Sequence, residues 1–268
     1  MPSFKFGKST ANCQEMNNCR TRGLILNVSD HSESDKLVTF YSPDLGRATG
    51  IAKGAKRSKH RFVNKLEEFS LLHFLYRPAK RDSLLFIADA DLEHSFLTLR
   101  QHYDRYVCAV YISELVMRFT REQDPDQSIF SLLTWAMQAL EDGIGSLKIT
   151  SLFHLRVLGA AGYQPELDRC GVCGKTVRLN QRYTLHPGSG SLVCSSCGGT
   201  ASESLFSLSL QTLKFLAYAQ RIELKNIGRL KIPAKNINES LTILYRYTQH
   251  LLQHDIISWN QIRSLYKV

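Results

Sequence analysis

Two pairs of cysteines constrain this chain more than any other feature of its sequence. Cys170 and Cys173 form one C-x2-C pair, and Cys194 and Cys197 form a second pair further along the chain. Tetrahedral Zn²⁺ binds four thiolates at about 2.3 Å, and two such pairs on facing turns supply that geometry. The tight turns favour residues that tolerate positive φ, and small residues stand there: Gly171, Gly174 and Gly198. The sequence therefore predicts a zinc ribbon with one structural ion per chain.

The segment between the cysteine pairs predicts a short hairpin. Residues 182–186 and 192–193 are strand-like and flank the turn sequence PGSG at 187–190. Two structural disulfides are the alternative to a metal, but nothing else in the chain suggests secretion. His186 has no role as a ligand once four thiolates fill the coordination shell. A closed site of this kind has no position for water or substrate, so its ion stabilises the fold and catalyses nothing.

Length and composition indicate an ordinary soluble protein with one large core or two smaller ones. The chain has 268 residues, of which 43% are hydrophobic and 22% are charged. No apolar run approaches the roughly 18 residues of a membrane span, and residues 1–22 lack the apolar segment of a secretory signal. We therefore expect a cytoplasmic protein without a membrane partner, in a compartment where thiols stay reduced.

Positive charge is concentrated in the N-terminal part of the chain. The formal net charge is +10. Residues 1–80 contain 14 Lys and Arg against 7 Asp and Glu, and the remainder contains 20 against 17, so the two parts carry +7 and +3. This asymmetry predicts a polyanion-binding surface in the N-terminal part.

The pattern after residue 23 is typical of short β-strands. Residues 1–19 are polar and irregular, and their cysteines, Cys13 and Cys19, are interpreted as incidental thiols. Turn-forming residues separate five apolar segments, at 24–28, 37–41, 48–52, 69–76 and 84–88. Five strands without intervening helices favour an α+β protein whose N-terminal domain, residues 20–91, is a five-stranded OB-type β-barrel.

The pattern changes to helical spacing beyond residue 91. Helices are expected over 103–116, 129–140, 147–161, 210–220 and 241–252, the last with Asn238 as its N-cap. Acidic residues before the first helix, Asp89, Asp91 and Glu93, are interpreted as complementing the dipole at its N-terminus. The second domain, residues 92–268, is thus a helical bundle with the zinc ribbon inserted at about 168–200.

One basic segment, residues 45–66, contains no Asp or Glu. It carries Arg47, Lys53, Lys56, Arg57, Lys59, Arg61 and Lys65. On an OB barrel this strand and loop would lie beside the face that binds single strands, so the segment predicts nucleic-acid binding. Phe62 stacks on a base or anchors the loop to the core. A solvated charged loop is the plainer interpretation, and an anionic membrane fits less well because no amphipathic helix carries these charges.

Catalytic interpretations find little support. Residues 50–56 resemble a phosphate-binding loop only superficially, because the GK[ST] sequence is missing. Ser29, Asp30 and His31 are the residue types of a catalytic triad. They are adjacent in a predicted turn, however, and cannot form the chain of hydrogen bonds that a triad requires. A metal-dependent nuclease using the acids at 89, 91 and 93 is one alternative function, and a zinc-ribbon transcription or RNA-associated factor is another. We expect a protein that is not an enzyme.

Several separate motifs resemble the bacterial RecO family of DNA repair proteins. In the barrel they are GLIL at 23–26, SESDK at 32–36, LGR at 45–47 and AKGAKR at 52–57. Further along, Leu158-Gly159 and the sequence GYxPxLxxC at 162–170 lead into the two cysteine pairs. The similarity runs in the expected order from about residue 20 to the end, and residues 1–19 depart from it.

The resemblance implies a recombination mediator with an OB domain, a helical domain and a zinc ribbon. Such a protein binds single- and double-stranded DNA, anneals complementary strands and partners with RecR. It also contacts the acidic C-terminal tail of the single-stranded-DNA-binding protein and so helps RecA to load. By position, Lys53, Lys56 and Arg57 are the implied DNA contacts, to which charge adds Arg47, Lys59 and Arg61.

Overall fold

The computed structural model describes residues 18–78, 84–179, 181–198 and 206–267. The chain divides into two compact units. One holds residues up to 96 together with residues 120–130, and the other holds residues 97–119 and the chain from residue 131 onward. The first unit therefore includes a segment that the sequence analysis had assigned to the helical part.

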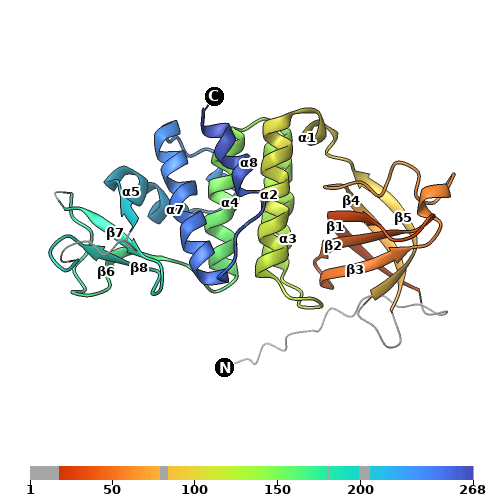
Figure 1. Cartoon of the computed structure of the whole chain (residues 1–268), viewed down its shortest axis with the longest axis horizontal. Helices are drawn as coiled ribbons and strands as arrows, with labels where there is room; N and C mark the ends of the chain where they lie inside the picture. The colour runs from red at the N-terminus through yellow and green to blue at the C-terminus, as the bar shows by residue number, and fades with distance from the viewer. Residues whose placement is uncertain (1–17, 79–83, 180, 199–205, 268) are drawn as a thin grey trace, which may run out of the picture. The chain divides into compact units, whose positions relative to one another are not determined.

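The first unit is a closed five-stranded barrel, as the sequence predicted (Figure 1). Its strands are β1 (Cys19–Asp30), β2 (Lys36–Ser42), β3 (Gly46–Ala52), β4 (Leu71–Arg77) and β5 (Leu84–His94). They pair in the order β1-β2-β3-β5-β4, and β1 closes the barrel against β4. All pairs are antiparallel except β3 with β5.

Period-two burial explains why these segments form strands around one core. Along β3, buried residues alternate strictly with half-buried ones. Inside the barrel the rings of Phe40 and Phe74 stack with centroids 4.3 Å apart. The backbone at Gly23 passes so close that a Cβ there would lie 2.6 Å from the Phe40 ring, so only glycine fits.

Residues 120–130 belong to the barrel unit through contacts that the sequence pattern did not predict. The Asp126 N–H donates to the Tyr41 hydroxyl at 3.1 Å, and the Gln123 N–H donates to the Arg47 carbonyl at 3.0 Å. The Arg22 guanidinium lies over the ring of Phe130, 5.5 Å from its centroid. The segment therefore packs with β1, β2 and β3 although it lies far from them in sequence.

The acids near residue 90 are strand residues, which corrects their interpretation as helix-dipole partners. Asp89, Asp91 and Glu93 belong to β5, and the next helix, α1 (Leu97–Gln101), has no acid in its first turn. Glu93 instead accepts hydrogen bonds from Arg22 at 2.5 and 2.7 Å. The only group of residues close enough to hold a metal ion in the described part of the chain is the cysteine set, so these acids form no cation site there.

The second unit is built from helices that the sequence mostly predicted. The helix α3 (Gln127–Glu141) begins in the barrel unit and continues into this one. The others are α2 (Tyr103–Phe119), α4 (Ser146–Ala160), α5 (Leu210–Ala219), α6 (Leu224–Ile227), α7 (Ala234–Leu252) and α8 (Trp259–Ser264). Helix α4 lies between α2 and α7 (Figure 1). Residues 149–155 are all buried, so this part of the helix has no face exposed to solvent, and the polar residues Thr150, Ser151 and His154 lie within the core.

The N-terminus of α7 differs from the prediction. The helix begins at Ala234 after Pro233, and Asn238 is not its cap but lies within its first turns. Proline is favoured at this end because its missing N–H is not needed there. From Leu241 onward, buried apolar residues recur along α7, which packs against α4.

A four-stranded sheet, with the turns that follow two of its strands, carries the four cysteines and packs on helices of the same unit. Its strands are β6 (Glu166–Cys170), β7 (Tyr183–His186), β8 (Ser191–Cys194) and β9 (Phe206–Leu208), in the order β6-β8-β7-β9. The predicted hairpin is β7 with β8. Leu185 and Leu192 of the sheet share a core with Leu213 of α5 and Leu244 of α7. Among the helices that the structure describes, none has the length and apolar character needed to cross a bilayer.

Candidate metal centre and nucleic-acid interface

The four predicted cysteines converge on one point. The Sγ atoms of Cys170, Cys173, Cys194 and Cys197 all lie within 4.8 Å of one another. The Cys173 and Cys194 sulfurs are 3.9 Å apart. Tetrahedral coordination at about 2.3 Å from the ion requires a sulfur separation of about 3.8 Å. The four side chains therefore form a metal-binding group that fits one tetrahedral ion.

The two halves of the centre have matching turns. The Gly174 N–H donates to the Cys170 carbonyl at 2.9 Å, and the Gly198 N–H donates to the Cys194 carbonyl at 3.0 Å. Gly174 has φ of +70°, as predicted, but Gly171 and Gly198 do not have positive φ. At Gly171 the constraint is space, because a Cβ there would lie 2.5 Å from the Ser191 Oγ.

The electrostatics of the thiols favour a bound cation. Burial opposes ionisation of Cys170, but N–H groups of residues 172, 173 and 194 outweigh it and lower its pKa to about 6. The neighbouring sulfurs of Cys194, Cys173 and Cys170, with some burial, raise the pKa of Cys197 to about 12. Four thiolates can coexist at this separation only if a positive ion lies between them.

Cys19 does not belong to this centre. Cys19 is buried in the barrel at the start of β1 and is disulfide-bonded, so its interpretation as an incidental thiol is wrong. Cys13 lies outside the described residues.

The basic segment comprises β3 and most of the connection from β3 to β4. It contains one short helical turn, η1 (Ala55–Arg57), and its apolar residues Phe62 and Leu66 are buried in the barrel core. Phe62 is only 3% exposed. Of the two interpretations of Phe62, core anchor and base-stacking ring, the structure therefore supports the anchor.

Two motifs that are separate in sequence hold each other in place. The Gly54 N–H donates to the Asp35 carboxylate at 2.8 Å, and the Lys56 N–H donates to the Ser34 carbonyl at 2.9 Å. The Gly54 hydrogen bond, aided by one from Ser34, lowers the pKa of Asp35 below its ordinary value. The SESDK turn thus fixes the backbone that presents the AKGAKR cations.

Two carboxylates, one at the end of β1 and one in the SESDK turn, lie next to two of the expected DNA contacts. The Lys56 Nζ is 2.9 Å from Asp30, and the Arg57 guanidinium is 3.6 Å from Glu33. The side chains of Asp30 and Glu33 are 72% and 94% exposed. The Arg57 pair is solvent-exposed on both sides and is worth about 0–1 kcal/mol. The Lys56 side chain is only 26% exposed, and its ammonium group also donates to the Ser32 carbonyl at 2.8 Å, so Lys56 is held more firmly.

The other expected contacts differ in accessibility. Lys53 and Lys59 are exposed and, within the part of the chain that the structure describes, take part in no ion pair. The Arg61 guanidinium lies 5.0 Å from the centroid of the Phe62 ring and donates to the Ala88 carbonyl at 3.2 Å. Arg47 is half-buried on β3, next to residues 120–130. Arg47 is therefore the least accessible of the predicted set.

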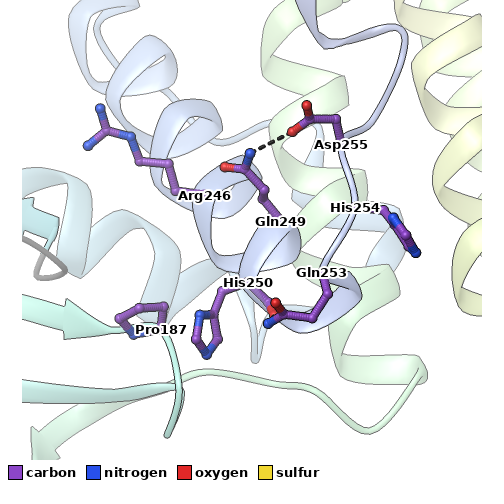
Figure 2. A pocket seen from close by; sticks show the side chains of 7 residues that line it. All are labelled: Pro187, Arg246, Gln249, His250, Gln253, His254 and Asp255. Atoms are coloured by element: carbon purple, nitrogen blue, oxygen red, sulfur yellow. Dashed lines mark hydrogen bonds between the residues drawn. The ribbon is translucent and has the colours of Figure 1, made fainter.

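A polar pocket lies at the C-terminal end of α7 (Figure 2). Its volume is about 610 Å³, and its lining includes Pro187, Arg246, Gln249, His250, Gln253, His254 and Asp255. The Asp255 carboxylate accepts hydrogen bonds from the Gln249 amide and the Tyr245 hydroxyl. None of the lining residues that the structure describes is a serine, threonine or cysteine, so these residues provide no hydroxyl or thiol nucleophile.

The fold and the site define a class: an OB-barrel protein whose helical unit carries a four-cysteine metal-binding ribbon. Residues 16–96 match the family model described as recombination protein O N terminal, and residues 100–260 match the model described as recombination protein O C terminal. The chain belongs to the recombination protein O (RecO) family, and it has a role in DNA repair, which implies DNA binding.

Individual relatives cover most of the chain. The DNA repair protein RecO of Syntrophus aciditrophicus is 32% identical over 240 residues, which are 89% of this chain and 93% of that protein. The RecO protein of Syntrophobacter fumaroxidans is 36% identical over 216 residues, covering 81% and 85%. That of Caldanaerobacter subterraneus is 29% identical over 244 residues, covering 89% and 95%. The family resemblance of the barrel and cysteine motifs is thereby confirmed.

Proposed function

We propose that this chain is a recombination mediator that acts on DNA without catalysing a reaction. It binds single- and double-stranded DNA, anneals complementary strands and, with RecR, helps RecA to load onto strands coated by the single-stranded-DNA-binding protein. The observation that carries the proposal is the acid-free loop fixed on an OB barrel. A protein with this role works in the bacterial cytoplasm and associates with the nucleoid when bound to DNA.

The proposed DNA contacts are five exposed cations of the loop and one half-buried cation of the preceding strand. They are Arg47, Lys53, Lys56, Arg57, Lys59 and Arg61. Support comes from the backbone hydrogen bonds that hold residues 54 and 56 to the SESDK turn, because a fixed backbone lowers the entropic cost of ordering the cations on a phosphate chain. Arg47 is the weakest member, since it is half-buried.

Annealing follows from electrostatics and needs no catalytic group. Two polynucleotide strands repel each other through their phosphates. A cationic surface neutralises phosphates, releases condensed counterions and raises the local concentration of strands. Little sequence preference is expected, because phosphate contacts carry no base information.

The partners belong to the proposal on grounds of family membership. We place RecR and the acidic C-terminal tail of the single-stranded-DNA-binding protein as direct partners and RecA as an indirect one. The tail site is assigned to the helical unit, without named residues. The ion in the four-cysteine centre is proposed to be Zn²⁺, because four thiolates at tetrahedral separation suit it, and its role is structural.

The test of this function compares two triple variants that remove the same charge. One is K53Q/K56Q/R57Q in the barrel, and the control is K175Q/R178Q/R182Q in the ribbon. If about four phosphates are contacted, the logarithm of the affinity for single-stranded DNA falls with the logarithm of salt with a slope near −3. The barrel variant should bind weakly with a slope near −1, and the ribbon variant should behave as the unmodified protein.

Annealing of complementary strands without ATP is the functional readout of the same experiment. We expect the barrel variant to lose most of its annealing rate at about 0.1 M salt, because it contacts fewer phosphates. An unchanged slope in the barrel variant would remove the assignment of these residues. Absence of annealing by the unmodified protein would remove the proposed function.

A further inference from the structure

A second acid-free cationic segment lies in the helical unit. No Asp or Glu occurs between Glu223 and Glu239, and the interval carries four cations: Lys225, Arg229, Lys231 and Lys235. All four are exposed. The segment spans α6 and the connection that leads into α7. It is comparable in charge density to the barrel loop but belongs to the other unit.

The backbone of this second segment is anchored. Ile227 is fully buried in the helical core. The ammonium group of Lys148, on α4, donates to the Gly228 carbonyl at 2.8 Å and adds a further positive charge beside the segment. The Arg229 N–H donates to the Asn226 carbonyl at 3.0 Å. The four cations therefore project from a fixed support.

Nearby carboxylates leave most of this charge uncompensated. Glu223 pairs with Lys225 at 2.8 Å, and both side chains are largely exposed. Glu239 is directed to Ser209, whose N–H and hydroxyl donate to it at 2.6 and 2.5 Å. Arg229, Lys231 and Lys235 take part in no ion pair within the described ranges. Three unpaired cations in seven residues produce a local positive potential.

We propose that residues 225–235 form a second binding site for a single-stranded polynucleotide, so that one chain holds two strands at once. This inference rests on the proposed function and deepens it. No large apolar side chain of the segment is exposed, so the surface suits a phosphate chain better than a peptide that inserts apolar side chains. Two strands held by one chain meet at a raised effective concentration, which assists annealing.

The experiment measures how many short strands one chain binds. The probe is a fluorescent single strand of about ten nucleotides, which falls within the usual site size of one binding surface. Titrations at low salt use the unmodified chain, R229Q/K231Q/K235Q, K53Q/K56Q/R57Q and the charge-matched control K175Q/R178Q/R182Q. Circular dichroism checks that each variant is folded, which we expect because all substituted residues are exposed.

We expect two strands per unmodified chain, two for the ribbon control and one for each of the other variants. Annealing by R229Q/K231Q/K235Q should fall at least threefold while one strand still binds with unchanged affinity at the barrel. A single strand per unmodified chain, or two strands on R229Q/K231Q/K235Q, would overturn this inference and leave the proposed function standing. A competition titration on K53Q/K56Q/R57Q, in which only this segment binds the probe, gives a second contrary outcome. If an acidic peptide displaces the probe at a lower concentration than unlabelled DNA does, the inference is overturned. If the unmodified chain binds no strand at all, the proposed function itself is refuted.

Discussion

A buried histidine makes the helical unit sensitive to acid. His154 of α4 is fully buried, with its Nδ1 3.1 Å from the Tyr111 hydroxyl on α2 and its Nε2 2.8 Å from the Thr248 hydroxyl on α7. Burial lowers the pKa of His154 from 6.5 to about 3. The neutral ring therefore joins three helices, and protonation requires either unfolding or a buried charge.

The sign and size of the effect follow from this pKa. Because the folded pKa lies below the unfolded value, the stability contributed by the neutral ring is present above pH 6.5 and is lost as the pH falls toward 3. One pH unit corresponds to about 1.4 kcal/mol, so lowering the pH from 7 to 5 should remove about 2 kcal/mol of unfolding free energy through this residue.

The assay is urea unfolding at pH 7 and pH 5, followed by helical circular dichroism. H154Q is expected to be less stable at pH 7 and to lose about 2 kcal/mol less than the unmodified protein on acidification. H250Q, which removes an exposed histidine of the same unit, should keep the unmodified pH dependence. Equal losses in H154Q and the unmodified protein, or a His154 pKa near 6.5 measured by NMR, would refute the reasoning.

Two further predictions concern the loop carboxylates and the metal. D30N/E33Q removes the carboxylates beside Lys56 and Arg57, so affinity for single-stranded DNA should rise severalfold, measured by fluorescence anisotropy at low salt. The charge-matched control E166Q/D168N removes two partly exposed acids of the ribbon, which pair with Arg169 and Arg221, and should leave the affinity unchanged. The reduced protein should contain about one zinc per chain by atomic absorption, and C170S should lower that content and the unfolding temperature, because metal binding stabilises the fold.

Each of these predictions has a contrary outcome. Equal affinity of D30N/E33Q and the unmodified protein would mean that Lys56 and Arg57 do not approach phosphates. Less than about one metal per reduced chain would contradict the four-thiolate centre. Full metal content in C170S would show that the ion is held elsewhere.

Local pattern was sufficient for most of the secondary structure. Short apolar segments separated by turn-forming residues located all five barrel strands, and helical spacing or a long apolar stretch located the long helices, because these elements supply the buried cores. Short elements were not predicted. Helix α6 has only four residues, which is too short for a helical period to be recognised in the sequence. The predicted start of α7 was too late. Asn238 is the better N-cap by residue preference, but the helix begins at Ala234, directly after Pro233.

The cysteine spacing determined the metal centre from sequence alone, since two C-x2-C turns define ligand type, number and geometry together. Basic composition indicated the loop that we propose as the polyanion-binding site. Only the tertiary structure decided that Asp30 and Glu33 lie beside Lys56 and Arg57, and that residues 120–130 pack on the barrel. Such contacts depend on which segments, distant in sequence, become neighbours in the folded chain. Neither composition nor periodicity contains that information.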